Sequence, residues 1–176
     1  MKFLFTAVSA FALLSGVAAA ADAPSPLMAS SSAFYGLMKD NVLRSADKMA
    51  EADYSFRPTP DVRTYGELLA HIANAQFIFC GIASDGKMVM KNFEKTAKTK
   101  TEIVAALNEG FAFCDRVYQK LTDADAATMV SFFGQQRTKL SLLDFNIAHG
   151  FEHYGNLVTY MRMKGIVPPS SEKKKM

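Results

Sequence analysis

The sequence predicts an all-α protein, a bundle of four helices in which the second and third helices run parallel. Four segments carry apolar residues at helical spacing, which predicts the helices. The link between the second and third segments is about fourteen residues long, which is enough to cross from one end of a bundle to the other. The chain has 176 residues, 49% of them hydrophobic, which is sufficient for one domain with a packed core.

The first helix is expected over residues 31–50, where Met38, Val42 and Met49 form an apolar stripe. The second is expected to begin at Thr64 and to end near Ser84, before Gly86. A threonine followed three residues later by a glutamate is a capping box, because each side chain satisfies a free backbone amide of the other residue. The sequence Thr64-Tyr65-Gly66-Glu67 has this pattern.

A second capping box, Thr99 with Glu102, marks the start of the third helix. The fourth helix is expected to start near Ser141 and to end at Gly165, with prolines following. We find no convincing β-hairpin signal. The bundle is therefore predicted over residues 31–169.

The termini are expected to lie outside the bundle. Lys2, the apolar stretch 3–17 and four alanines follow the pattern of a secretory signal peptide, assigned to residues 1–21. An uncleaved anchor is the alternative, but the stretch is shorter than the ~20 residues of a spanning helix. Residues 22–30 are predicted to be a flexible segment, and residues 170–176 a disordered basic tail.

These features predict an exported protein, periplasmic or secreted, without a membrane partner once the leader is removed. Twenty Lys and Arg against seventeen Asp and Glu give a net charge of +3, which argues against a nucleic-acid partner. An oxidising compartment permits a disulfide. Two cysteines are too few for a four-cysteine zinc site.

The two cysteines test the parallel arrangement. Cys80 lies 16 residues past the Thr64 cap, and Cys114 lies 15 past the Thr99 cap. At ~1.5 Å of rise per residue, parallel helices place both at the same height. Antiparallel helices would separate them beyond the ~7 Å Cα limit for a disulfide. A disulfide and parallel helices therefore support each other; two buried free thiols are the alternative.

All three histidines of the chain fall on predicted helices. His149 and His153 are four residues apart, so they project from one face of the fourth helix and can bind one metal ion. His71 lies in the middle of the second helix. A single helical histidine is more often a structural residue whose ring nitrogens have hydrogen-bond partners in the protein. Together, however, the three histidines predict a metal site with an open coordination position.

The face of the fourth helix that carries His149 is unusually polar. Asn146, Asn156 and Tyr160 share this face by helical arithmetic. Buried imidazoles and amides need partners, which a metal ion and its bound water would supply. These three residues are therefore candidates to support the metal or contact a substrate. Glu152 flanks the same face, although a glutamate in that position is more often solvated.

Three segments resemble the DinB-like family of bacterial helical bundles. They are RTYGELLAHIA at 63–73, HGFEHYGNL at 149–157 and YMRMKGIVPP at 160–169. The resemblance implies an up-down-down-up order of the four helices. It also implies that His71, His149 and His153 bind one divalent metal ion, zinc or nickel in many members. Many members have Arg-Gly-Gln after the last histidine, whereas this chain has Tyr-Gly-Asn.

Family members with known activity resemble thiol-dependent transferases and isomerases that use bacillithiol or mycothiol. Those thiols are cytoplasmic, which disagrees with the predicted leader. We therefore expect a metal-dependent hydrolase or thiol transferase of the cell envelope, acting on a small molecule. The alternatives are a non-catalytic metal-binding or stress-associated protein and an interaction module with structural histidines. Phe132, Phe133, Met88 and Met90 lie in predicted loops that can cover the site or a homodimer surface.

Overall fold

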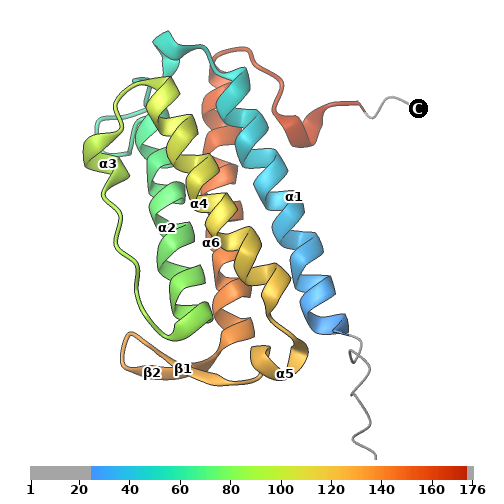
Figure 1. Ribbon diagram of the computed structural model, residues 1–176. Helices are drawn as coiled ribbons and strands as arrows, with labels where there is room; N and C mark the ends of the chain where they lie inside the picture. The colour runs from blue at the N-terminus through green and yellow to red at the C-terminus, as the bar shows by residue number, and fades with distance from the viewer. Residues whose placement is uncertain (1–24, 174–176) are drawn as a thin grey trace, which may run out of the picture.

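The computed structural model describes residues 25–173, which are mostly helical with one small antiparallel sheet (Figure 1). Four long helices are accompanied by short helices and a hairpin in the connections. In chain order the elements are α1 (Pro26–Lys48), η1 (Glu51–Asp53), α2 (Tyr65–Asp85), α3 (Phe93–Thr96), α4 (Lys100–Lys120), α5 (Asp123–Ala126), β1 (Met129–Phe132), β2 (Gln135–Thr138), α6 (Lys139–Met163) and η2 (Pro169–Ser171).

Contacts between the long helices show their directions. Cys114 of α4 lies against Cys80 of α2, and Gly110, one turn earlier, lies against Gln76, so α2 and α4 run the same way. Two pairs of aromatic rings join α2 to α6. Tyr65, near the start of α2, lies against Tyr160, near the end of α6, and Phe79, near the end of α2, lies against Phe145, near the start of α6. Hence α2 and α6 run in opposite directions. In Figure 1, α1 and α6 run upward while α2 and α4 run downward.

Both predicted capping boxes are present. The Thr64 hydroxyl accepts the Glu67 amide at 3.2 Å, and the Glu67 carboxylate accepts the Thr64 amide at 2.8 Å. Thr99 and Glu102 make the same two bonds at the start of α4. These bonds satisfy amides that a helix start leaves unpaired, so the starts of α2 and α4 are confirmed as predicted.

A disulfide joins α2 to α4. The Cα atoms of Cys80 and Cys114 lie 5.4 Å apart, and both side chains are fully buried. The bond closes a loop between residues 34 positions apart. By the loop-entropy model such a cross-link contributes about 3–4 kcal/mol to the free energy of unfolding. It also ties the helix that carries His71 to its parallel neighbour.

The predicted start of the first helix is wrong by five residues. Helix α1 begins at Pro26, so residues 26–30 are helical rather than a flexible segment. The reason is a cap from elsewhere in the chain. The Asp123 carboxylate accepts the backbone amides of Leu27 and Met28 at 3.1 and 2.9 Å. A negative charge there also complements the helix dipole.

The expected disorder after residue 169 is also wrong for the described part of the tail. Residues 169–171 form η2, where Ser170 Oγ lies 2.7 Å from the Tyr154 hydroxyl. Glu172 pairs with both Arg44 and Lys48 of α1. Residues 174–176 and the predicted leader and its cleavage site lie outside the described residues.

A short hairpin that the sequence did not predict precedes α6. Strands β1 and β2 have four residues each, too few for a clear alternation, and meet in a turn at Phe133 and Gly134. Such turns favour Asn-Gly, whereas Phe133 has a φ of +47°. Thr138, the last residue of β2, caps α6 by accepting the Ser141 amide at 3.2 Å. Helix α6 therefore starts two residues earlier than expected.

Helix α2 packs against both α4 and α6. It is apolar and long enough to cross a membrane, but 83% of its most apolar window is buried by the other helices. Gly110 permits the close approach of α4. A Cβ at this position would lie 2.9 Å from the Ala73 carbonyl oxygen and 3.2 Å from Gln76 Cβ. Neither the carbonyl nor the Cβ can swing aside as a flexible side-chain end would.

We predict that Gly110→Ala lowers the free energy of unfolding by about 1–3 kcal/mol, because the added methyl group overpacks the α2–α4 contact. Gly155→Ala is the matched control. Gly155 is also inside a helix, but nothing lies within 4 Å of the position of its Cβ. Alanine there should raise stability by about 0.5–1 kcal/mol, through lower backbone entropy in the unfolded chain. Chemical denaturation measures both, and a Gly110→Ala protein as stable as the wild type would contradict the packing.

Candidate metal centre

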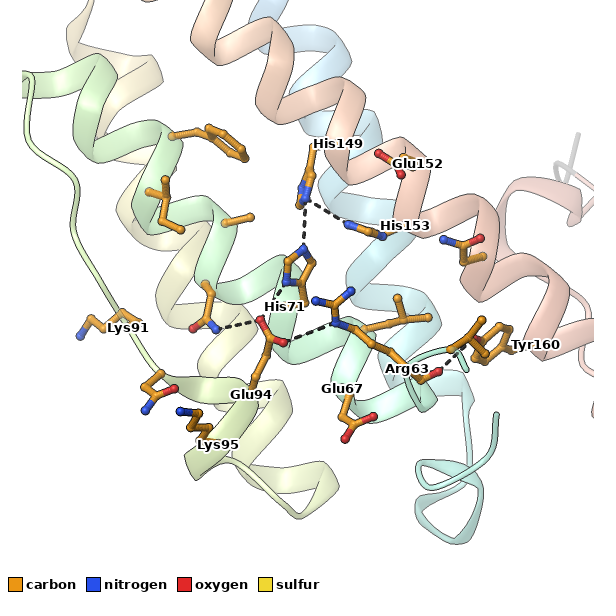
Figure 2. A pocket seen from close by; sticks show the side chains of 18 of the residues that line it. Arg63, Glu67, His71, Lys91, Glu94, Lys95, His149, Glu152, His153 and Tyr160 are labelled. Carbon is orange, nitrogen blue, oxygen red and sulfur yellow. Dashed lines mark hydrogen bonds and ion pairs between the residues drawn. The ribbon is translucent and has the colours of Figure 1, made fainter. Parts of the chain in front are cut away.

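The three histidines meet on the face where α2 packs against α6. His71 projects from α2, and His149 and His153 project from α6 one turn apart (Figure 2). The Nε2 atom of His149 lies 3.2 Å from Nε2 of His71 and 3.0 Å from Nε2 of His153. Ligand atoms of all three lie within 4.8 Å of one another. The predicted triad is therefore brought together by the antiparallel contact of two helices.

The two nitrogen separations from His149 fit ligands of one metal ion, and the separation of His71 from His153 is at most 4.8 Å. Zinc binds imidazole nitrogen at about 2.0–2.1 Å, so nitrogens that share an ion at right to tetrahedral angles lie about 2.9–3.4 Å apart. Both measured Nε2 separations from His149 fall within this range. The donor set is three neutral nitrogens, which leaves the full charge of a divalent ion available to a further ligand.

The chemistry of the three rings also favours an ion. His71 Nδ1 donates to Glu94 Oε1 at 2.8 Å, so in the neutral ring its Nε2 carries a lone pair. His149 Nε2 faces that lone pair and His153 Nε2 together, yet it can hold one proton at most. If all three rings are neutral, the single proton on His149 Nε2 can therefore form a hydrogen bond to His71 or to His153, but not to both. A cation at the point of convergence satisfies all three lone pairs.

Burial keeps the α6 histidines in the neutral form that binds metal. Loss of solvent, together with the neighbouring His153 and His71, lowers the pKa of His149 to about 4. Burial also lowers the pKa of His153, with His71 contributing. Both rings are therefore neutral at neutral pH. A metal ion does not have to displace protons from them in order to bind.

Glu94 is a functional candidate that the sequence did not reveal. It lies on α3, in the long link, and its carboxylate contacts His71, Asn74 at 3.3 Å and Arg63 at 3.4 Å. Burial opposes its charge, but His71, Asn74 and Arg63 outweigh burial and lower the pKa of Glu94. A single glutamate 23 residues from His71 has no spacing pattern that sequence reasoning can use.

Glu94 orients only one of the three rings. Among the described residues, the buried Nδ1 atoms of His149 and His153 have no hydrogen-bond partner. A carboxylate on the far nitrogen of a histidine ligand fixes its tautomer and ring position. Among the three histidines, His71 is therefore the one whose tautomer and ring direction are set by a hydrogen bond to the protein.

A pocket of about 1200 Å³ opens above the three histidines. Predicted residues Glu152, Asn156 and Tyr160 line it, and the Tyr160 hydroxyl donates to the Arg63 carbonyl at 2.9 Å. Four of the seven α2 residues in its wall are apolar. Its α2 residues are Glu67, Leu68, His71, Asn74, Ala75, Ile78 and Phe79.

Asn146 does not line this pocket, which corrects the prediction that it supports the metal or contacts substrate. It is fully buried and exchanges two hydrogen bonds with Gln76, at 2.9 and 3.2 Å. The helical arithmetic placed Asn146 on the correct side of α6. However, it lies almost one turn from His149 along the helix, at a height where α2 presents Gln76.

The loop residues have different surroundings. Met90 lines the pocket, so one of the predicted loop contacts does lie at the site. Phe132 packs on Phe79, whose ring lies 5.4 Å from the His149 ring. Phe133, at the hairpin tip, is 80% exposed and does not line the pocket.

The fold and the site define a class: a mostly helical protein with a candidate three-histidine metal centre between two antiparallel helices. Within that class, the chain belongs to the DinB superfamily, which it matches over residues 36–157. The match includes all three histidines. It shows the family, and not the activity of this chain.

Several relatives share the fold at low identity. An uncharacterized protein of Bacillus subtilis, YjoA, is 24% identical over 123 residues, which are 68% of this chain and 79% of YjoA. The crystal structure of YjoA matches with a TM-score of 0.68, 20% identity, and 83% and 99% coverage of the two chains. A DinB-like protein from Bacillus cereus ATCC 10987 matches with a TM-score of 0.70, 20% identity, and 80% and 95% coverage.

A mycothiol-dependent maleylpyruvate isomerase has a similar fold at 14% identity, with a TM-score of 0.61. The match covers 77% of this chain but only 61% of the isomerase. At this identity the likeness concerns the fold alone.

We predict that Glu94→Gln weakens metal affinity about tenfold, because the amide no longer offers a charged acceptor to His71 Nδ1. Glu152→Gln is the matched control: it removes another carboxylate of the pocket, one without a hydrogen bond to a histidine. Competition with a chelator of known affinity measures both variants. Equal affinities for wild type and Glu94→Gln would show that Glu94 does not support the centre.

Proposed function

We propose that this chain is an exported, metal-dependent member of its family, acting on a small molecule at a three-histidine centre. His71, His149 and His153 would hold one divalent ion, zinc or nickel. The reaction would be thiol transfer or hydrolysis. The proposal includes the up-down-down-up order of the long helices that the family resemblance implied, with which the directions in Figure 1 agree.

The convergence of three Nε2 atoms carries the proposal. Two separations of 3.0 and 3.2 Å suit ligands of one ion and are poorly suited to neutral histidines without one. Three protein ligands leave a coordination position open, as in catalytic zinc sites, whereas structural sites use four. The pocket of about 1200 Å³ gives a small molecule access to that position.

When bound, such an ion supplies Lewis acidity, which activates a water or thiol and polarises an oxygen. The chain supplies position and surroundings. Glu94 holds the His71 ring by its Nδ1 proton. Leu68 and Phe79 contribute apolar surface to one wall of the pocket. Glu152 lies beside His149 in the pocket lining, and is the carboxylate we propose to accept a proton from a bound water or thiol.

Thiol chemistry is the first of the two reactions to test. The isomerase of similar fold is mycothiol-dependent, although this chain spans only 61% of it. Thiolate sulfur is also a good ligand for zinc and nickel. The alternative is a protein that binds the metal without catalysis, in which case the pocket would hold no substrate.

The buried disulfide supports export. Cross-links of this kind form and persist in oxidising compartments such as the periplasm or the extracellular space. Cys80 and Cys114 are fully buried in the structure, so their pairing is a feature of the core. The leader-like sequence of residues 1–21 is a second, independent support.

We predict about one equivalent of one divalent metal in protein purified from an oxidising compartment without a histidine tag, measured by elemental mass spectrometry. His71→Ala and His149→Ala should each lose most of it, because each removes one of three ligands. Asn156→Ala, which changes a pocket residue with no bond to a histidine, should keep it. Metal-restored thiol transfer or hydrolysis after chelation would establish catalysis.

Two results would contradict parts of this account. Protein that takes up no metal, even after dialysis against zinc and nickel, would show that the histidines are structural. Protein with full metal but no metal-dependent turnover of thiol or hydrolysable substrates would support the non-catalytic alternative.

A further inference from the structure

Arg63 is a positively charged side chain in the pocket of a site that we propose to hold a cation. It immediately precedes the Thr64 cap, and its carbonyl accepts the Tyr160 hydroxyl at 2.9 Å, which fixes its backbone against α6. The side chain is 45% exposed and lines the pocket. Figure 2 shows its guanidinium group extending towards His71 and His153.

The guanidinium group is only partly used by the protein. Its Nε atom donates to Glu94 Oε2 at 3.4 Å. Within residues 25–173, the two terminal nitrogens make no hydrogen bond. They form the end of the guanidinium fork, where two parallel N–H groups suit the two oxygens of a carboxylate.

The charges of the centre are unbalanced without a ligand. A divalent ion and Arg63 together carry three positive charges. Glu94, next to them, and Glu152, in the pocket lining beside His149, contribute two negative charges. The three histidine ligands would be neutral. An arginine beside a metal ion is electrostatically unfavourable unless an anion lies between them. One anionic ligand can occupy the open coordination position and also accept hydrogen bonds from the two terminal nitrogens of Arg63.

We infer that Arg63 binds the anionic group of the substrate, so that the substrate class is small carboxylates with a second group for the metal. This inference rests on the proposed function and narrows it. Other cations of the pocket are less suited to this role. Lys91 is paired with Glu109 at 2.9 Å, and Figure 2 shows Lys91 and Lys95 on the side of the pocket away from His153.

Two small thiols test the inference. Thioglycolate and 2-mercaptoethanol both offer a thiol to the metal, but only thioglycolate carries a carboxylate. Each is titrated into the purified protein fully loaded with cobalt(II), a spectroscopic substitute for zinc, and thiolate binding is followed by charge-transfer absorption. The ratio of the two dissociation constants isolates the carboxylate, because differences between the thiols themselves are the same for every variant.

We expect wild type to bind thioglycolate more tightly than 2-mercaptoethanol, and Arg63→Gln to reduce this preference about tenfold or more. Arg63→Lys should fall between them, because lysine keeps the charge but loses the paired donors. Lys95→Gln is the control that removes one positive charge from the same pocket, and it should keep the wild-type preference.

The outcomes separate the two proposals. If the protein does not load with metal, the proposed function fails, and this inference fails with it. If it loads with metal and Arg63→Gln keeps the wild-type preference, the role of Arg63 is overturned while the metal centre stands. An equal loss in Lys95→Gln would also overturn it, because the effect would then be one of total pocket charge.

Discussion

The antiparallel packing of α2 on α6 is the contact on which the centre depends. It sets which residues of the two helices face each other, from Tyr65 with Tyr160 to Phe79 with Phe145. Between these pairs, the same register brings His71 to the two histidines of α6. A slide of one turn, ~5.4 Å, would separate Nε2 atoms that now lie within 3.2 Å. The centre is therefore a consequence of helix packing rather than of a loop.

One buried feature holds this register directly, and a second anchors α2 to its other neighbour, α4. The amides of Gln76 and Asn146 exchange hydrogen bonds about one turn from the histidines, and a slide would leave both groups buried without partners. The disulfide lies one turn further along α2, at Cys80, and ties that helix to α4. The apolar core contributes area, but directional bonds such as these specify one alignment among several of similar burial. The polar face of α6 thus has two parts. Asn146 pairs with Gln76 in the core, whereas Asn156 and Tyr160 line the pocket.

The sequence predicted those features that depend on local residues. The caps at Thr64 and Thr99, and the shared face of His149 and His153, need only spacing along one helix. The missed features need residues that are distant in the chain. Asp123 caps α1 from nearly a hundred residues away, and Glu94 reaches His71 from the link. Asn146 shows the intermediate case, in which helical spacing gave the right side of α6 but not the partner facing it.

The proposed function depends on the convergence of three imidazole nitrogens on one ion. X-ray absorption spectroscopy of the zinc-loaded protein tests this most directly, because it reports the number, kind and distance of the ligand atoms. We expect three imidazole nitrogens at about 2.0–2.1 Å from zinc, with an additional light ligand in the open position. A first shell with fewer than three imidazoles, or one made chiefly of carboxylate oxygens, would contradict it.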